Sequence, residues 1–190
     1  MISPHILIII HSGLLILLLV INGTTDLVRN KLYNAVNFPA IVLGILVNIL
    51  WGLDALQFSI IGLVIGFGLF FIVFLIGSGA MGGGDVKFMA AVGAIGIPRF
   101  QESVGGYPFI LWASFYSALV GGLIAIIAMI AKGRLIYSLK NVARTTFTFL
   151  LPFLKTVPLK PEDSIKVPFG FGIAVGTLWT WWLYAFGVLK

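Results

Sequence analysis

Long apolar stretches dominate this chain and leave little room for any fold other than a bundle of membrane helices. Of its 190 residues, 60% are hydrophobic and 9% are charged, whereas soluble domains carry about 25% charged residues. Segments of about 20 apolar residues can cross a bilayer as helices, and shorter ones can do so beside other protein. The sequence excludes a water-soluble fold and predicts an all-α polytopic membrane protein with a single membrane-embedded domain over residues 1–190.

About six transmembrane helices can be placed along the chain. The candidate spans cover about residues 5–21, 38–53, 58–76, 86–97, 107–131 and 167–189. The connection 132–166 is too polar to cross and too long for a tight turn. Its apolar residues recur at helical spacing between basic ones, which fits either an amphipathic helix on the lipid surface or a solvated loop.

Basic residues divide unevenly between the two sets of loops that six crossings create. Ten of the 12 Lys and Arg residues fall in one set, which includes the connection 132–166, and only Arg99 and Lys190 fall in the other. Lys and Arg accumulate in cytoplasmic loops. We therefore expect both termini outside and a basic cytoplasmic connection between the fifth and sixth spans. Orientation in the bilayer also explains the net charge of +6 without a nucleic-acid partner.

Two of the six acidic residues stand beside apolar stretches. Asp26 follows the first span within a few residues and Asp85 directly precedes the fourth, whereas the other four fall in predicted loops. Ionisable groups at a membrane edge are costly, so each is a candidate functional residue. One span precedes Asp26 and three precede Asp85, which predicts that both carboxyls lie on the cytoplasmic face.

A pair of nearby carboxyls has a specific chemistry. When two carboxyls lie within a few ångströms they hold one proton between them. The ionised member can take a proton from water while the protonated member binds a developing oxyanion, as in aspartic proteases, and neither step requires a metal or cofactor. Because Asp85 opens a predicted helix, whose positive end favours a carboxylate, we expect it to be the more readily ionised member.

Four further residues are candidates for supporting roles. Gly82 and Gly84 precede Asp85 and would let a peptide strand approach the acid, although a plain helix-opening turn has the same composition. Lys87 would either pair with an acid or extend to lipid headgroups. Asn34 would support the first aspartate or belong to a polar turn.

Glycines also occur within the apolar spans. Gly62 and Gly66 are four residues apart in the third span. This spacing permits two membrane helices to approach closely, although it also arises by chance.

The motifs together resemble the type IV prepilin peptidases, membrane aspartic proteases marked by Gly-x-Gly-Asp. The segment Gly82–Lys87, with the sequence Gly-Gly-Gly-Asp-Val-Lys, matches the second-aspartate motif of that family, and Asp26–Asn34 resembles the first. Val167–Gly170 resembles the start of its last helix, although Phe171 stands where many relatives have proline. The resemblance covers almost the whole chain and implies that Asp26 and Asp85 are catalytic.

The resemblance also implies a substrate and a setting. The substrate would be a prepilin, pseudopilin or preflagellin whose basic leader ends in glycine before a hydrophobic helix, cut at the cytoplasmic membrane of a prokaryote. The chain has no cysteine, whereas larger members carry a Cys-x-x-Cys domain and also N-methylate the product. It is therefore similar to the short class associated with tight-adherence pili or preflagellin processing, and we expect peptidase activity without methylation, with a homodimer as one option.

Two alternative functions stay open from the sequence. A presenilin-like intramembrane protease also uses Gly-x-Gly-Asp, but it would place both aspartates inside helices and carry a Pro-Ala-Leu segment, which is absent here. A small proton-coupled transporter or a membrane subunit of a secretion system would use membrane carboxyls as proton relays or helix contacts, near the middle of the bilayer and within repeated halves.

Overall fold

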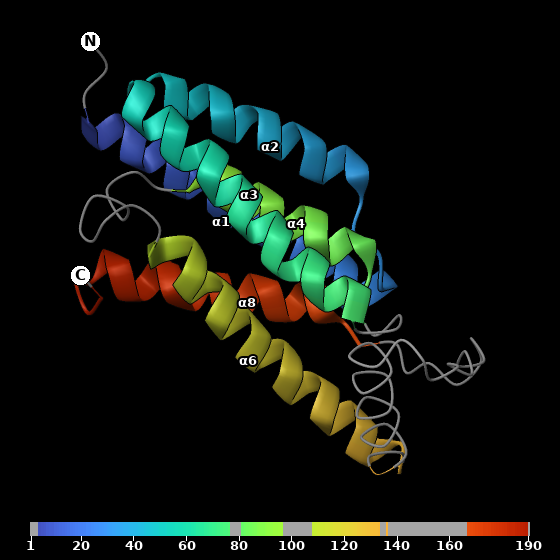
Figure 1. The fold of residues 1–190 in the computed structure, drawn as a ribbon. Coiled ribbons are helices and arrows are strands. Elements are labelled where there is room, and N and C mark those ends of the chain that lie inside the picture. The colour runs from blue at the N-terminus through green and yellow to red at the C-terminus, as the bar shows by residue number, and fades with distance from the viewer. Residues whose placement is uncertain (1–3, 77–80, 97–107, 134–135, 137–166, 190) are drawn as a thin grey trace, which may run out of the picture.

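The fold is a bundle of helices that run between two ends of the molecule (Figure 1). The structure is a computed structural model and describes residues 4–76, 81–96, 108–133, 136 and 167–189. The described residues form the helices α1 (Pro4–Arg29), α2 (Asn34–Ile49), α3 (Leu53–Ile76), α4 (Gly83–Ile95), α6 (Pro108–Ala131) and α8 (Phe169–Ala185). The start of α1 and the end of α8 lie at one end, and the end of α1 and the starts of α2, α4 and α8 lie at the other.

Local sequence explains where the helices start and stop. Pro4 and Pro108 are the first residues of α1 and α6, where a proline loses no hydrogen bond. Helix α1 ends because Asn30 has a φ of 49°, a left-handed conformation that asparagine tolerates better than most residues. The Asn30 N–H still bonds the Asp26 carbonyl at 2.8 Å.

Each predicted span corresponds to one described helix, but two boundaries were wrong in ways that matter. Helix α1 continues past residue 21 to Arg29, so Asp26 lies inside a helix and not in the loop after it. Helix α3 begins at Leu53, so Asp54 lies in its first turn and not in a loop. The expected amphipathic helix within 132–166 falls almost entirely outside the described residues.

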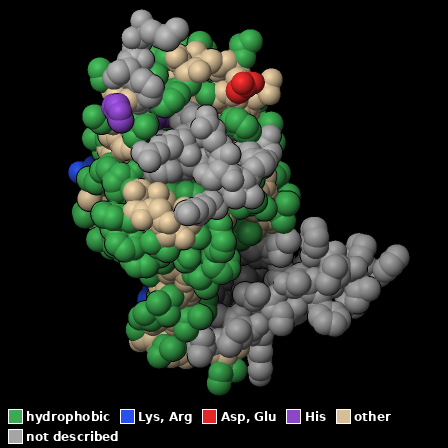
Figure 2. Space-filling view, turned by 90° about the vertical axis from the view of Figure 1, so that its left-hand side faces the viewer, with side chains coloured by type: hydrophobic (Ala, Val, Ile, Leu, Met, Phe, Trp, Pro, Cys, Tyr) green, Lys and Arg blue, Asp and Glu red, His purple; other side chains and the backbone are tan. Residues whose placement is uncertain are grey.

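The outer surface is that of a membrane protein. Within the described residues, α1, α3 and α6 are long and apolar enough to cross a bilayer, and α2 is a shorter apolar helix. Large hydrophobic side chains are exposed on these helices, with Ile9 at 69% and Leu69 at 41%. Hydrophobic side chains cover most of the described part of the face seen in Figure 2. An apolar exterior of this extent is stable only against lipid.

Helix α4 is enclosed by protein because glycines let α3 and α2 approach its backbone. A Cβ atom on Gly62 would lie 2.5 Å from the Gly93 carbonyl oxygen, and one on Gly66 would lie 2.5 Å from that of Met89. A Cβ on Gly44 of α2 would lie 2.8 Å from the Ile95 nitrogen. The expectation that Gly62 and Gly66 mediate close helix contact is therefore confirmed, and nearly every residue of α4 after Gly84 is buried.

Polar side chains satisfy the buried C-terminal end of α4. The side-chain amide of Asn48 donates to the carbonyls of Ala94 and Ile95 at 3.3 and 3.1 Å, and the Ser59 hydroxyl also donates to Ala94. The last carbonyls of a helix have no partner within it, and leaving them bare in an apolar interior is costly. These bonds allow a helix of 13 residues to end inside the protein.

A second glycine contact joins α6 to α8. Gly172 and Gly176 of α8 lie against the backbone of α6 at Gly121 and Ser117. Such close backbone approach fixes how far α8 extends along α6. It thereby places the first turn of α8 at the end of the bundle where α1 ends and α4 begins.

Candidate active site

Asp26 lies on the last turn of α1 and faces the start of α8. Its carboxylate oxygen Oδ2 accepts a hydrogen bond from the Phe171 N–H at 3.1 Å, and the Gly170 N–H also hydrogen-bonds it. These are free N–H groups of the first helical turn, which stabilise a negative charge. Asp26 is only 6% exposed, so it is a buried carboxyl held at a helix N-terminus.

Asp85 lies in the first turn of α4 and is held by its own glycine turn. The Gly82 N–H donates to Asp85 Oδ2 at 2.9 Å, and the Asp85 N–H bonds the Gly82 carbonyl at 3.1 Å. Asp85 is also 6% exposed, whereas Gly82 and Gly83 are exposed. The glycine motif thus positions the acid and leaves one side of it bare of side chains.

The end of α1 and the start of α4 lie at the same end of the bundle, as the number of crossings predicted, and the charge of Asp26 acts on Asp85. Asp85 lies outside the three long apolar helices, and burial raises its pKa to about 7, opposed by the Gly82 hydrogen bond and reinforced by the charge of Asp26. Burial disfavours the charged form more than the helix end favours it. The raised pKa argues against the expectation that Asp85 is the more readily ionised carboxyl. That expectation considered the helix end but not the burial of the side chain.

Two side-chain contacts near the carboxyls were not expected from the sequence. A Cβ atom on Gly84 would lie 2.9 Å from Leu32 Cβ. A Cβ on Gly170 would lie 3.0 Å from both Leu32 methyl carbons and 3.0 Å from Asp26 Oδ2. A side chain at either place would press on Leu32. The only sequence signal was that Gly84 and Gly170 belong to motifs while Leu32 is an apolar residue in a polar connection.

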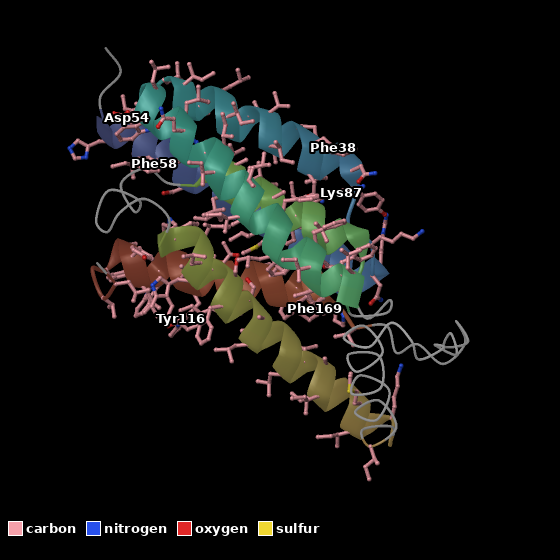
Figure 3. All side chains as sticks on the ribbon, in the orientation of Figure 1. Phe38, Asp54, Phe58, Lys87, Tyr116 and Phe169 are labelled. Carbon is pink, nitrogen blue, oxygen red and sulfur yellow. The ribbon has the colours of Figure 1, made fainter. Side chains whose placement is uncertain are left out.

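Lys87 and Asn34 contact each other. The Lys87 ammonium donates to Asn34 Oδ1 at 3.0 Å and lies 5.5 Å from the centre of the Phe38 ring. Figure 3 shows Lys87 and Phe38 together at the end of the bundle where Phe169 lies, with Asp54 at the opposite end. Among the described residues, Lys87 thus pairs with the first residue of α2 and not with an acid, and Asn34 does not contact Asp26.

A buried amide pair lies one turn before Asp26. The Asn22 amide donates to Asn37 Oδ1 at 2.9 Å, and both side chains are fully buried. This bond joins α1 to the first turn of α2. Asn37 therefore supports the helix that carries Asp26, although through Asn22 and not by touching the carboxyl.

The described residues hold both carboxyls inside helices at one end of the bundle. Location in a helix therefore does not distinguish this site from that of a presenilin-like protease. The position at one end of the bundle differs from the site near the middle of the bilayer that a transporter would have. Within the described ranges no three His, Cys, Asp or Glu side chains gather as potential metal ligands. The arrangement that remains is a buried, interacting pair of carboxyls.

Comparisons with known proteins agree with these motifs. The sequence model of the type IV leader peptidase family matches residues 13–126. The chain is 32% identical over 129 residues to a prepilin leader peptidase/N-methyltransferase of Neisseria gonorrhoeae, covering 65% of this chain and 42% of that protein. It thus spans less than half the length of this curated relative, and no solved structure matches significantly. On the strength of the family match, which covers more than half of its residues, this chain belongs to the type IV leader peptidase family.

Proposed function

We propose that this protein is an aspartic endopeptidase that removes the basic leader of prepilin-like substrates, with Asp26 and Asp85 as its catalytic pair. The observation that carries the proposal is that two buried carboxyls lie at one end of the bundle, each held by backbone N–H groups, and that the charge of Asp26 acts on Asp85. A structural carboxyl gains nothing from a buried acidic neighbour, whereas a proton-sharing pair requires one. Family membership supports the substrate class.

The proposed reaction uses the two carboxyls in different protonation states. Asp85 holds the shared proton near neutral pH, so the charge falls to Asp26, where the N–H groups of α8 stabilise it. Asp26 takes a proton from water as the oxygen attacks the scissile carbonyl carbon, and Asp85 gives its proton to the carbonyl oxygen. The resulting diol then collapses. Asp26 passes its proton to the leaving nitrogen, the C–N bond breaks, and Asp85 recovers its proton.

The exposed Gly82–Gly83 backbone is the proposed side of approach for the peptide. It has no side chains to obstruct an extended strand and lies beside the Asp85 carboxyl. The basic residues near this end, among them Arg29 and Lys31, support its assignment to the cytoplasmic side. The absence of methylation, the short-class membership and a homodimer stay predictions.

Cleavage by the purified protein tests the proposed function. The full chain is reconstituted in vesicles with a prepilin whose basic leader precedes a hydrophobic segment, and the products are weighed by mass spectrometry. We expect one cut at the boundary between leader and hydrophobic segment, unaffected by a metal chelator. A cut within the hydrophobic segment would favour the presenilin-like alternative, and an intact prepilin would overturn the proposal.

The pH dependence follows from the state of Asp85. Activity requires Asp85 to be protonated, and its pKa is raised to about 7, so we expect kcat to fall as the pH rises through about 7. Activity should also fall at acid pH, when the pair binds its second proton. Single-turnover cleavage measured across this range checks the profile, and a rate that keeps rising above neutral pH would contradict the assignment of Asp85 as the proton donor.

A further inference from the structure

Leu32 is placed differently from every other residue of the connection between α1 and α2. Its neighbours Asn30, Lys31, Tyr33 and Asn34 are exposed, whereas Leu32 is half-buried and packs against the hydrophobic core. Its Cβ lies against Gly84, the residue before Asp85, and its methyl groups lie against Gly170, beside the Asp26 carboxylate. One aliphatic side chain thus touches both helix starts that hold the carboxyl pair.

We propose that Leu32 is a positioning residue of the active site, whose isobutyl group fills the space between the first turns of α4 and α8, fixes the separation of Asp26 and Asp85 and excludes water from that side. This inference rests on the proposed function. The glycines make the contact specific, because a methyl group at either Gly84 or Gly170 would occupy the space that Leu32 fills. The open side of the pair is then the exposed Gly82–Gly83 backbone.

The charges around the pair leave burial as the dominant influence on Asp85. Asp26 is the ionisable group of α1 that acts on it, while Arg29 bonds Tyr33, Lys87 bonds Asn34 and Lys31 is exposed. Helices α2, α3 and α8, as described, contain no Asp, Glu, Lys, Arg or His except Asp54, which lies at the opposite end of the bundle from the pair. Removing an aliphatic group that keeps water out should therefore ease ionisation of Asp85.

The test is Leu32→Ala in the full chain, reconstituted and assayed with the prepilin described above. We expect kcat to fall about tenfold with KM little changed, and the alkaline fall in activity to move down by about one pH unit. Loss of folded protein lowers the active fraction but does not move a pH midpoint, so the shift separates positioning from a merely structural role. Leu32→Met, which retains the bulk, should restore both values.

Leu46→Ala is the matched control, because it removes the same atoms from a side chain of α2 that is 52% exposed. It should leave kcat and the pH profile unchanged. A Leu32→Ala protein with the wild-type profile would overturn the role of Leu32 while leaving the proposed function intact. If the wild type itself does not cleave the prepilin, the proposed function fails. The role of Leu32 can then still be tested by infrared titration of the protonated Asp85 carboxyl, whose band is identified by its loss in Asp85→Asn. A shift in the pH midpoint of that band in Leu32→Ala would support the role of Leu32, and an unchanged midpoint would overturn it.

Discussion

Replacing either carboxyl by its amide, in Asp26→Asn or Asp85→Asn, should reduce prepilin cleavage by roughly a hundredfold to ten-thousandfold, the range expected when a general acid or base is removed. The amides have nearly the same size, so packing should persist. Asp26→Asn removes the acceptor that takes the proton from water, and Asp85→Asn removes the proton donated to the carbonyl oxygen. The double variant should be little worse than either single one, because the two groups act as a unit.

Asp54→Asn provides the matched control for these variants. Asp54 is an exposed acid in the first turn of α3, at the opposite end of the bundle from Lys87 and Phe169. Its replacement should leave the cleavage rate unchanged. Circular dichroism and elution volume check that each variant keeps its helices, and a folded Asp26→Asn or Asp85→Asn protein that cuts at the wild-type rate would remove that residue from the catalytic pair.

Adding one methyl group at Gly93 should destabilise the protein and also reduce its activity. A Cβ on Gly93 would collide with the Gly62 carbonyl of α3, and because both partners are backbone, relief requires the helices to separate. Overpacking costs about 1–3 kcal/mol and more where the backbone must move. For a chain of this size we expect Gly93→Ala to lower the apparent Tm by roughly 6–12 °C if the cost is near 3 kcal/mol.

The same Gly93→Ala change should lower cleavage in the fraction that stays folded, because α4 carries Asp85. Gly68→Ala on α3 is the control. A Cβ at Gly68 meets nothing within 4 Å, and alanine is the better helix former, so the Tm should stay constant or rise slightly. Thermal unfolding in one detergent, followed by circular dichroism, compares the two. Equal effects of Gly68→Ala and Gly93→Ala would show that the close contact between α3 and α4 contributes nothing specific.

Much of the fold follows from the sequence because membrane helices are specified by composition. Each of the six predicted spans corresponds to a described helix, and the parity argument correctly placed Asp26 and Asp85 at one end. The predicted end of the first span failed for a definite reason. Apolar residues give way to Asn22, Thr24 and Thr25 after residue 21, but the threonine hydroxyls bond carbonyls of their own helix and Asn22 bonds Asn37.

The parts of the site that could not be predicted are those that depend on contacts between distant segments. The Phe171 N–H reaches Asp26 across 145 positions of sequence, and a motif alone does not say what its backbone binds. The expectation for the ionisation of Asp85 considered only its place at the start of a helix, whereas its burial depends on residues elsewhere in the chain. Leu32 was an apolar residue in a polar connection, but that pattern becomes meaningful only when both facing glycines are known.

The way α4 ends has a consequence for how the protein responds to different lipids. Because Asn48 and Ser59 complete the hydrogen bonds of its last carbonyls inside the protein, this helix does not have to match the thickness of the hydrocarbon layer. The longer helices α1, α3 and α6 can tilt to accommodate a thinner or thicker bilayer. The position of Asp85 along the bundle is then set by its protein neighbours, independently of acyl-chain length.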